Sequence, residues 1–381
     1  MDDEYIEQLK REAEMGDSNA QFHLSLIYSL GTDLPCDKEK SLELMTLAAE
    51  RNHTCAMKTL ARKYQYESPE LAMHWLTKAA DIGNVEAQSI LATIYANTSS
   101  IHFIYVEVPK DEKKAFMWAD RAARNGGSSE WYFMGCMYAN GIGVAQDDRE
   151  AFNWIKMAAD QGHEGAMKDL IPMYKFGYGV QQDCREAARL LMHFAEQGDA
   201  KSQYQLGVMN YKGDGIPRDY REAAKWFIKV AGQGNTKAQY QLGVMYASGD
   251  GVPRDFKAAV KWYRKAARQG RPVRVWTNLG NHYYNGDGVP QDYKEALKWY
   301  RKAAKCGFVP ALHQLGLMYA NGEGVPKDNV TGCAWLIATG SHLLKADRDL
   351  VAARLTPEEL AKAQELSHEL RKKIEARKGA R

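Results

Sequence analysis

The 381-residue sequence has no long hydrophobic run and no dominant charge. Lysine and arginine number 51 against 48 aspartates and glutamates, so the net charge is only +3. No basic block is interleaved with aromatic residues, which argues against nucleic acid as the principal partner. No stretch stays apolar for the roughly 20 residues that a membrane-spanning helix needs. The N-terminal sequence MDDEYIEQLKREAEMGD lacks the apolar segment of a signal peptide. We therefore expect no membrane insertion.

Cysteine and catalytic motifs are also scarce. The six cysteines follow no regular spacing; they are Cys36, Cys55, Cys136, Cys184, Cys306 and Cys333. Reduced thiols in a cytoplasmic protein are expected rather than a disulfide framework. The motifs HExxH, CxxC and GxSxG do not occur, and the ten histidines are scattered. The sequence thus predicts no enzyme, no cofactor and no metal site, while a site assembled from distant residues stays open.

A glycine-rich segment that ends in aspartate occurs several times. Its best example is QLGVMYASGDGVPRD at 241–255, and its copies are YKGDGIPRD (211–219), YNGDGVPQD (284–292), ANGEGVPKD (320–328), ANGIGVAQD (139–147) and KFGYGVQQD (175–183). Lys261 stands where a calcium loop counted from Asp250 needs glutamate. No Gly-Lys-Ser/Thr follows the glycines, as a phosphate loop requires. The recurrence favours a turn that every repeat needs.

Each glycine-rich loop belongs to a longer unit. Aligned on Ala238, the units begin at spacings of 36, 31, 43, 36, 36, 36, 37 and 36 residues. The equivalent positions are Ala20, Ala56, Ala87, Glu130, Ala166, Ser202, Ala238, Val275 and Ala311. Nine units therefore cover nearly the whole chain.

The sequence pattern of one unit predicts two helices. Leu242, Gly243 and Tyr246 share a face of the first helix, and its glycine suggests close approach to a neighbour. Asp255 can cap the second helix. Glutamate three residues after this aspartate predicts capping-box-like pairs at Asp147–Glu150, Asp183–Glu186, Asp219–Glu222 and Asp292–Glu295. One slot of the second helix, predicted to lie in the core, holds Trp75, Trp118, Trp154, Trp226, Trp262, Trp299 and Trp335.

These units resemble the Sel-one-like repeat family, which is related to tetratricopeptide-repeat proteins. The pattern A-x-x-x-L-G-x-x-Y-x-x-G-x-G-V-x-x-D, followed by A-x-x-W-x-x-x-A-A-x-x-G, extends over roughly residues 17–340. The resemblance implies an all-α, right-handed superhelical solenoid of antiparallel helix pairs with a concave groove. It also implies scaffold or adaptor work in signalling, protein quality control or host–microbe contact. The second unit departs from the pattern because YQYESPELA (64–72) lacks the glycine loop, and the third carries the insertion NTSSIHFIYVEVPK (97–110).

The expected organisation has three parts. Residues 1–16 form an N-terminal capping helix, 17–341 hold nine repeats, and 342–381 form a C-terminal capping helix with a basic tail. About 20 helices result. The C-terminal helix, started by Thr356 and Pro357, could instead dock a partner. The insertion at 97–110 could fold onto its own unit or mediate self-association.

Partner binding is expected on first-helix side chains that turn away from neighbouring helices. These candidates are Tyr132, Lys201, Tyr204, Tyr211, Lys237, Tyr240, Arg274, Asn281, Tyr284 and His313. If the units curve as in tetratricopeptide proteins, they line the concave groove, where tyrosines edged by cations suit an extended peptide or a helix. The alternative is that some of these tyrosines pack between adjacent first helices.

The predicted function is a non-catalytic cytoplasmic scaffold or adaptor that binds a partner protein or peptide in this groove. Two alternatives stay open at this point. One is a hydrolase-type enzyme with a site assembled in the groove. The other is a host-interaction or virulence-associated factor.

Overall fold

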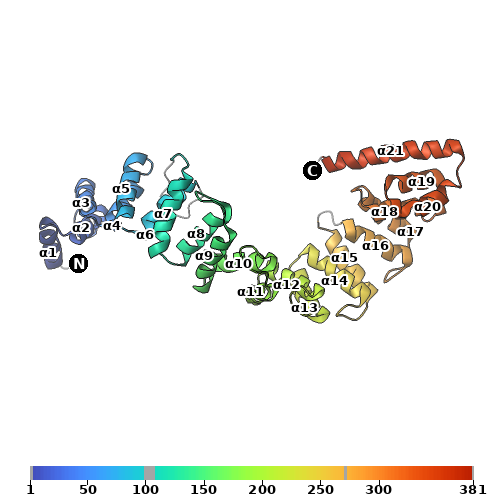
Figure 1. Ribbon diagram of the computed structural model, residues 1–381, viewed down its shortest axis with the longest axis horizontal. Helices are drawn as coiled ribbons and strands as arrows, with labels where there is room; N and C mark the ends of the chain where they lie inside the picture. The colour runs from blue at the N-terminus through green and yellow to red at the C-terminus, as the bar shows by residue number, and fades with distance from the viewer. Residues whose placement is uncertain (1–2, 98–107, 270–272, 380–381) are drawn as a thin grey trace. The chain divides into compact units, whose positions relative to one another are not determined.

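The computed structural model describes residues 3–97, 108–269 and 273–379, and within them every regular element is helical (Figure 1). These residues form 21 α-helices and one short 3-10 helix, which confirms the predicted all-α fold of about 20 helices. The chain divides into two compact units, residues 1–190 and 191–381, which are described separately.

The first unit contains a leading helix and four complete helix pairs. Its helices are α1 (Asp3–Glu14), α2 (Ser18–Leu30), α3 (Lys38–Glu50), α4 (Thr54–Tyr64), α5 (Pro69–Asp81), α6 (Val85–Ala96), α7 (Glu112–Asn125), α8 (Ser128–Asn140), α9 (Asp148–Asp160) and α10 (Glu164–Phe176). Helix α11 (Cys184–Glu196) contains the division between the units.

The second unit continues the same alternation of first and second helices. It contains α12 (Ala200–Lys212), α13 (Tyr220–Gly232), α14 (Thr236–Ser248), α15 (Phe256–Ala267), α16 (Val273–Asn285), α17 (Tyr293–Ala304), α18 (Val309–Asn321) and α19 (Asn329–Ala338). A 3-10 turn (His342–Leu344), α20 (Lys345–Ala352) and α21 (Pro357–Gly379) follow. The C-terminal α21 is the long helix in red in Figure 1.

Aspartate caps begin the second helices as the sequence predicts, except α5, whose N-cap Ser68 makes no side-chain bond. The Asp255 carboxylate accepts a hydrogen bond from the Ala258 N–H at 3.0 Å. The Asp255 N–H donates to the carbonyl of Tyr246 at 2.8 Å, which ties the loop to the first helix. Both bonds satisfy polar groups that helix ends would otherwise leave unpaired.

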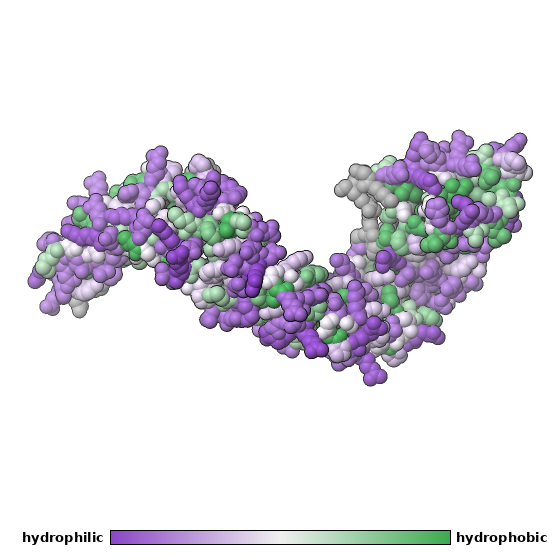
Figure 2. Space-filling model, in the orientation of Figure 1, coloured by the Kyte–Doolittle hydropathy of each residue, from purple (hydrophilic) through white to green (hydrophobic). Residues whose placement is uncertain are grey.

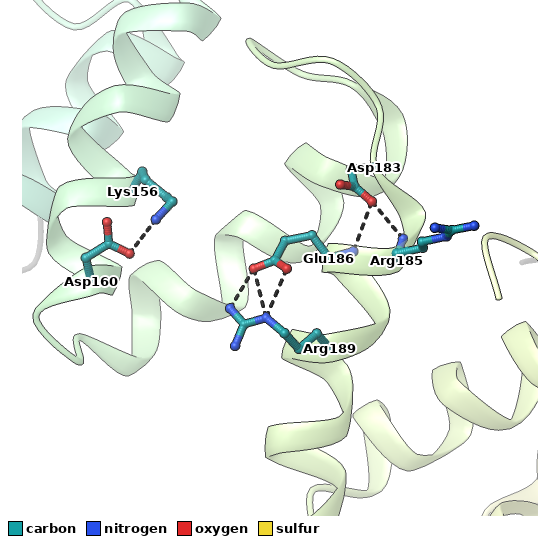
Figure 3. Close-up of polar contacts among 6 residues, drawn as sticks. All are labelled: Lys156, Asp160, Asp183, Arg185, Glu186 and Arg189. Atoms are coloured by element: carbon teal, nitrogen blue, oxygen red, sulfur yellow. Dashed lines mark hydrogen bonds and ion pairs between the residues drawn. The ribbon is translucent and has the colours of Figure 1, made fainter.

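The prediction that the glutamate three residues after the aspartate completes a capping box is wrong. Figure 3 shows Asp183 accepting from the N–H groups of Arg185 and Glu186. The Glu186 side chain does not return to the Asp183 N–H, because that N–H is already bonded to the carbonyl of Tyr174. Glu186 pairs instead with Arg189 on the next turn, with the shortest contact at 2.6 Å. Glu222 and Glu295, at the same position of α13 and α17, likewise pair with Lys225 and Lys298 one turn later.

The two loop glycines have different roles. Gly249 (φ 86°) ends α14 in the left-handed region. Gly251 (φ 69°) lies so close to the start of α13 that a Cβ there would be 2.1 Å from the carbonyl oxygen of Tyr220. The second glycine of each of four other loops approaches the first residue of the preceding second helix in the same way; these are Gly143, Gly179, Gly288 and Gly324. The loop thus fastens one repeat to the one before it.

The helix-interior glycine admits a large side chain from the second helix. A Cβ on Gly243 would lie 2.3 Å from Cε1 of Tyr263, and one on Gly207 would lie 2.8 Å from Cε1 of Phe227. Tyr263 is 2% exposed and Phe227 is fully buried. The predicted close approach is confirmed, and its partner is this second-helix side chain.

The repeated tryptophan position, which the sequence predicts to lie in the core, is buried in only some of the repeats. Three tryptophans are buried: Trp75, Trp118 and Trp226. Four are half-buried: Trp154, Trp262, Trp299 and Trp335. In the second unit the residue after the tryptophan is more deeply buried than the tryptophan itself. The reason is that this residue faces the glycine inside the first helix.

The ends of the repeat array are covered by helices of the same chain. Ile6 and Leu9 of α1 are buried in one cluster with Leu24 of α2. At the other end, Ala363 and Ile374 of α21 are buried in the clusters formed around α19 and α18. The apolar face of α21 is therefore packed inside its own unit. Thr356 begins this helix as predicted, with its hydroxyl accepting from the Glu359 N–H at 3.2 Å.

Candidate interaction surface

The first helices of the second unit carry nine of the ten predicted binding residues. Three of the nine are the cations Lys201, Lys237 and Arg274, which occupy the same position in α12, α14 and α16. All three side chains are exposed. Figure 2 shows hydrophilic side chains over most of the visible surface, with hydrophobic ones in smaller groups between them. Their exposure leaves the three cations accessible to a partner.

Tyr204 and Tyr240 stand three residues after two of these cations, on the same helix faces. Both rings are half-buried. The Tyr204 ring lies 5.7 Å from that of Phe227, and the Tyr240 ring lies 6.1 Å from that of Tyr263. Burial raises the pKa of Tyr204, and a hydrogen bond from the side chain of Gln241 partly opposes it. These tyrosines rest on the core and keep part of the ring accessible.

Three other candidate tyrosines hydrogen-bond to a carboxylate of the following repeat. The hydroxyl of Tyr211 donates to Asp250 at 3.3 Å, and that of Tyr284 donates to Glu323 at 3.0 Å. Both acceptors are the acid between the two loop glycines. Burial, aided by the Glu323 carboxylate, raises the pKa of Tyr284 to about 12.

In the first unit, Tyr132 on α8 makes a related contact. Its hydroxyl donates to Asp169 at 2.8 Å, and its ring lies 4.5 Å from that of His163. Burial raises the pKa of Tyr132, and the neighbouring Cys136 and Asp169 add to the shift. Like Tyr211 and Tyr284, Tyr132 links one repeat to the next through its hydroxyl.

The last two candidates also have partners inside the chain. Asn281 is exposed and accepts a hydrogen bond from the buried Tyr300 hydroxyl at 2.7 Å. His313 lies 2.7 Å from a carboxylate oxygen of Asp347 on α20. Asn281 therefore satisfies a core hydroxyl, and His313 contributes to the packing of the C-terminal segment.

The structure thus separates the candidates by what else they do. We call Lys201, Tyr204, Lys237, Tyr240 and Arg274 the basic–aromatic strip, because each is exposed or half-buried and none takes part in the carboxylate or core-hydroxyl bonds of the other five. Binding of a partner by any of the ten residues stays a prediction.

A second repeated contact lies on the second helices, and the sequence analysis missed it. Lysine three residues after the tryptophan places its ammonium over the indole ring, at 4.7 Å for Lys229 on Trp226. The distance is 4.4 Å for Lys265 on Trp262 and 4.2 Å for Lys302 on Trp299. Trp-x-x-Lys was visible in the sequence, and helical spacing brings such residues together.

Within residues 3–97, 108–269 and 273–379, three or more metal-binding side chains nowhere gather into a potential ion site. None of the helices in these ranges is both long and apolar enough to cross a membrane. Most of the insertion at 97–110, residues 98–107, lies outside the described residues, so its predicted role in self-association stays a prediction.

Comparison with protein-family models identifies the family of the repeats. The Sel1 repeat model matches nine segments: residues 18–53, 65–84, 102–127, 132–163, 173–199, 200–235, 236–270, 277–308 and 309–338. The chain is a Sel1 repeat protein. Proteins of this family are generally protein-interaction scaffolds.

Two solved structures are similar to this Sel1 repeat protein over most of its length. A Sel1 repeat protein from Oxalobacter formigenes is 28% identical, with a TM-score of 0.54, covering 91% of this chain and 90% of its own. A protective antigen of uropathogenic Escherichia coli is also 28% identical, with a TM-score of 0.47 and coverages of 97% and 95%. Comparison with curated proteins gave no match.

Proposed function

We propose that this Sel1 repeat protein is a non-catalytic scaffold that binds an acidic peptide segment of a partner protein on its basic–aromatic strip. The observation that carries the proposal is the repeated pairing of an exposed cation with a half-buried tyrosine. The two pairs are Lys201 with Tyr204 and Lys237 with Tyr240. Arg274 extends the row of cations. A repeating row of this kind suits an extended ligand that presents side chains at intervals.

The two residue types supply different parts of the binding free energy. Tyrosine offers apolar contact area and a hydroxyl at a low entropic cost. Tyr204 and Tyr240 are already positioned by the core rings beneath them, so binding immobilises little more. Exposed lysine and arginine attract carboxylates, raise the association rate and make it salt-dependent. The proposed ligand is therefore an extended segment with acidic residues beside apolar ones.

The remaining parts of the chain have supporting roles in this proposal. Residues 1–16 and 342–381 cap the nine repeats of 17–341 and keep the array soluble. Six cysteines without a regular pattern favour a reducing cytoplasm. Almost every recurrent residue has a structural contact, which favours a scaffold over an enzyme.

The test compares charge reversal on the strip with charge reversal elsewhere. Partners are captured from the native cytoplasm by the wild-type protein and by the triple variant Lys201→Glu, Lys237→Glu, Arg274→Glu. The matched control replaces three exposed cations at the second position of second helices, Arg221, Lys257 and Lys294, by glutamate. We expect the strip variant to lose at least about tenfold in affinity, roughly 1.4 kcal/mol or more, with an unchanged melting temperature.

Tyrosine variants separate binding from folding. Tyr240→Ala should weaken binding, whereas Tyr284→Ala should mainly lower the melting temperature, because Tyr284 holds Glu323 of the next repeat. Equal affinity of the strip variant and its control would reject the proposal. Loss of binding only in parallel with unfolding would reject it as well.

A further inference from the structure

A cavity of about 420 Å³ lies in the first unit between α2, α3 and α4. Leu42, Met45 and Leu60 give it an apolar floor, and Lys38 and Lys63 stand exposed at its rim. This volume falls in the range of ligand pockets. The cavity belongs to the first unit, so it is independent of the basic–aromatic strip.

The cavity coincides with the departure of the second repeat from the common pattern. Only Gln65–Ser68 connect α4 to α5, whereas the full glycine loop, 249–255, connects α14 to α15. In complete repeats, the second loop glycine packs on the first residue of the preceding second helix, as Gly251 packs on Tyr220. The residue equivalent to Tyr220 in the first repeat is Lys38, the first residue of α3. Because the second repeat lacks the loop, this contact is missing there.

The rest of the cavity wall corresponds to the surface on which a glycine loop packs in the complete repeats. We call this surface the seat of the loop. Around α13, the loop residue Val252 packs in the cluster that contains Phe227 and Tyr220. The position of Phe227 is occupied by Met45 in α3, and Met45 lines the cavity. The cavity therefore has the place and the apolar floor of a loop that the chain does not supply.

The acid of the loop also has a counterpart at the cavity. Asp250 accepts a hydrogen bond from Tyr211 at the end of the preceding first helix. The equivalent residue in the first repeat is Ser29, whose side chain is exposed and lines the cavity. Lys38 and Lys63 stand at the same rim as the exposed Glu39, and Lys63 also pairs with Glu67 at 3.8 Å. A carboxylate placed here would meet a hydroxyl donor and two cations, with Glu39 acting against it, so the apolar floor and the missing glycine contact carry more of the argument than charge does.

We propose that this cavity binds a turn of a partner protein in which an acidic residue, a glycine and an aliphatic residue follow one another. The acid lies against Ser29, Lys38 and Lys63, and the aliphatic side chain lies on Leu42, Met45 and Leu60. Glycine between them permits the close approach to the backbone of α3 that Gly251 makes to α13. The partner thus completes the second repeat in trans, as a strand completes an open sheet edge in other proteins.

The probe is the chain's own complete loop, supplied as a fluorescent peptide with the sequence ASGDGVPRD, and the full-length protein is titrated into it. We expect saturable binding, because other repeats hold this sequence on an equivalent seat. Replacing the peptide's first aspartate by asparagine, or its valine by serine, should weaken binding at least about fivefold. On the protein, the double variant Lys38→Ala, Lys63→Ala should do the same, and Lys257→Ala, Lys294→Ala is the matched control.

A loop-grafted variant tests the location of the site directly. Replacing Gln65–Ser68 by GDGVPRD fills the seat in cis, so it should abolish peptide binding and raise the melting temperature. Unchanged binding by the grafted variant, or no binding by the wild type at millimolar peptide, overturns the proposal. Binding that emerges only after deletion of 98–107 would assign the cavity to that segment of the same chain and would also overturn it. Dimerisation through the cavity, seen as a doubled mass that Lys38→Ala, Lys63→Ala abolishes, would assign the cavity to a second copy of this chain and would likewise overturn the proposal.

Discussion

The contact between Gly243 and Tyr263 predicts the effect of a single added methyl group. In Gly243→Ala, the new Cβ would lie 2.3 Å from Cε1 and 2.5 Å from Cδ1 of Tyr263. Carbon atoms in ordinary contact are roughly 3.5–4.0 Å apart, so the ring or the helix must move. Tyr263 is only 2% exposed, and its hydroxyl accepts from Asn278 at 3.1 Å, which limits movement of the ring.

The expected magnitude is a balance of two effects. Alanine gains about 1 kcal/mol over glycine in a helix interior. Overpacking a filled core costs about 1–3 kcal/mol, and the short distances here favour the upper end. We therefore expect Gly243→Ala to lower the free energy of unfolding by about 1–2 kcal/mol.

Gly232, the last residue of α13, is the matched control. A Cβ there would have no heavy atom of the described residues within 4 Å. Gly232→Ala should therefore stabilise the protein by about 0.5–1 kcal/mol. Urea unfolding followed by circular dichroism measures both changes, with midpoints compared because long repeat arrays can unfold in parts.

A double mutant identifies the ring as the cause. In a Tyr263→Ala background the clash is absent, so Gly243→Ala should become neutral or stabilising. If Gly243→Ala is as stable as Gly232→Ala in the wild-type background, or equally harmful after Tyr263 is removed, the packing argument is wrong.

Three further predictions concern other positions. Trp226→Ala should cost about 3–5 kcal/mol because Trp226 is 6% exposed; a loss below about 1 kcal/mol would contradict its burial. Burial and Glu323 raise the pKa of Tyr284 to about 12, so its contribution to stability is complete below pH 10 and disappears as the pH rises through 12. Melting temperatures of the wild type and Tyr284→Phe should therefore converge between pH 10 and 12, and a constant difference would refute this. If the insertion mediates self-association, deleting 99–106 should lower the mass in solution, and an unchanged oligomeric state would reject it.

Much of the fold follows from local features of the sequence. A left-handed glycine such as Gly249 ends a helix, and an aspartate such as Asp255 begins the next one. Both effects act within a few residues, so they can be predicted from the sequence without a structure. Their recurrence at a nearly constant period then determines the number of repeats and the family.

The tertiary structure decided which side chain of each neighbouring pair is buried and which partner it meets. Adjacent helix residues differ by about 100° in direction, so periodicity could not distinguish Trp262 from Tyr263, and only the glycine on the facing helix places Tyr263 in the core. Tyr211 looked like a free binding residue, yet its hydroxyl meets Asp250 in the next repeat. The cavity beside Lys38 likewise depends on a loop missing one repeat later. These contacts join different repeats, and spacing within one repeat carries no information about them.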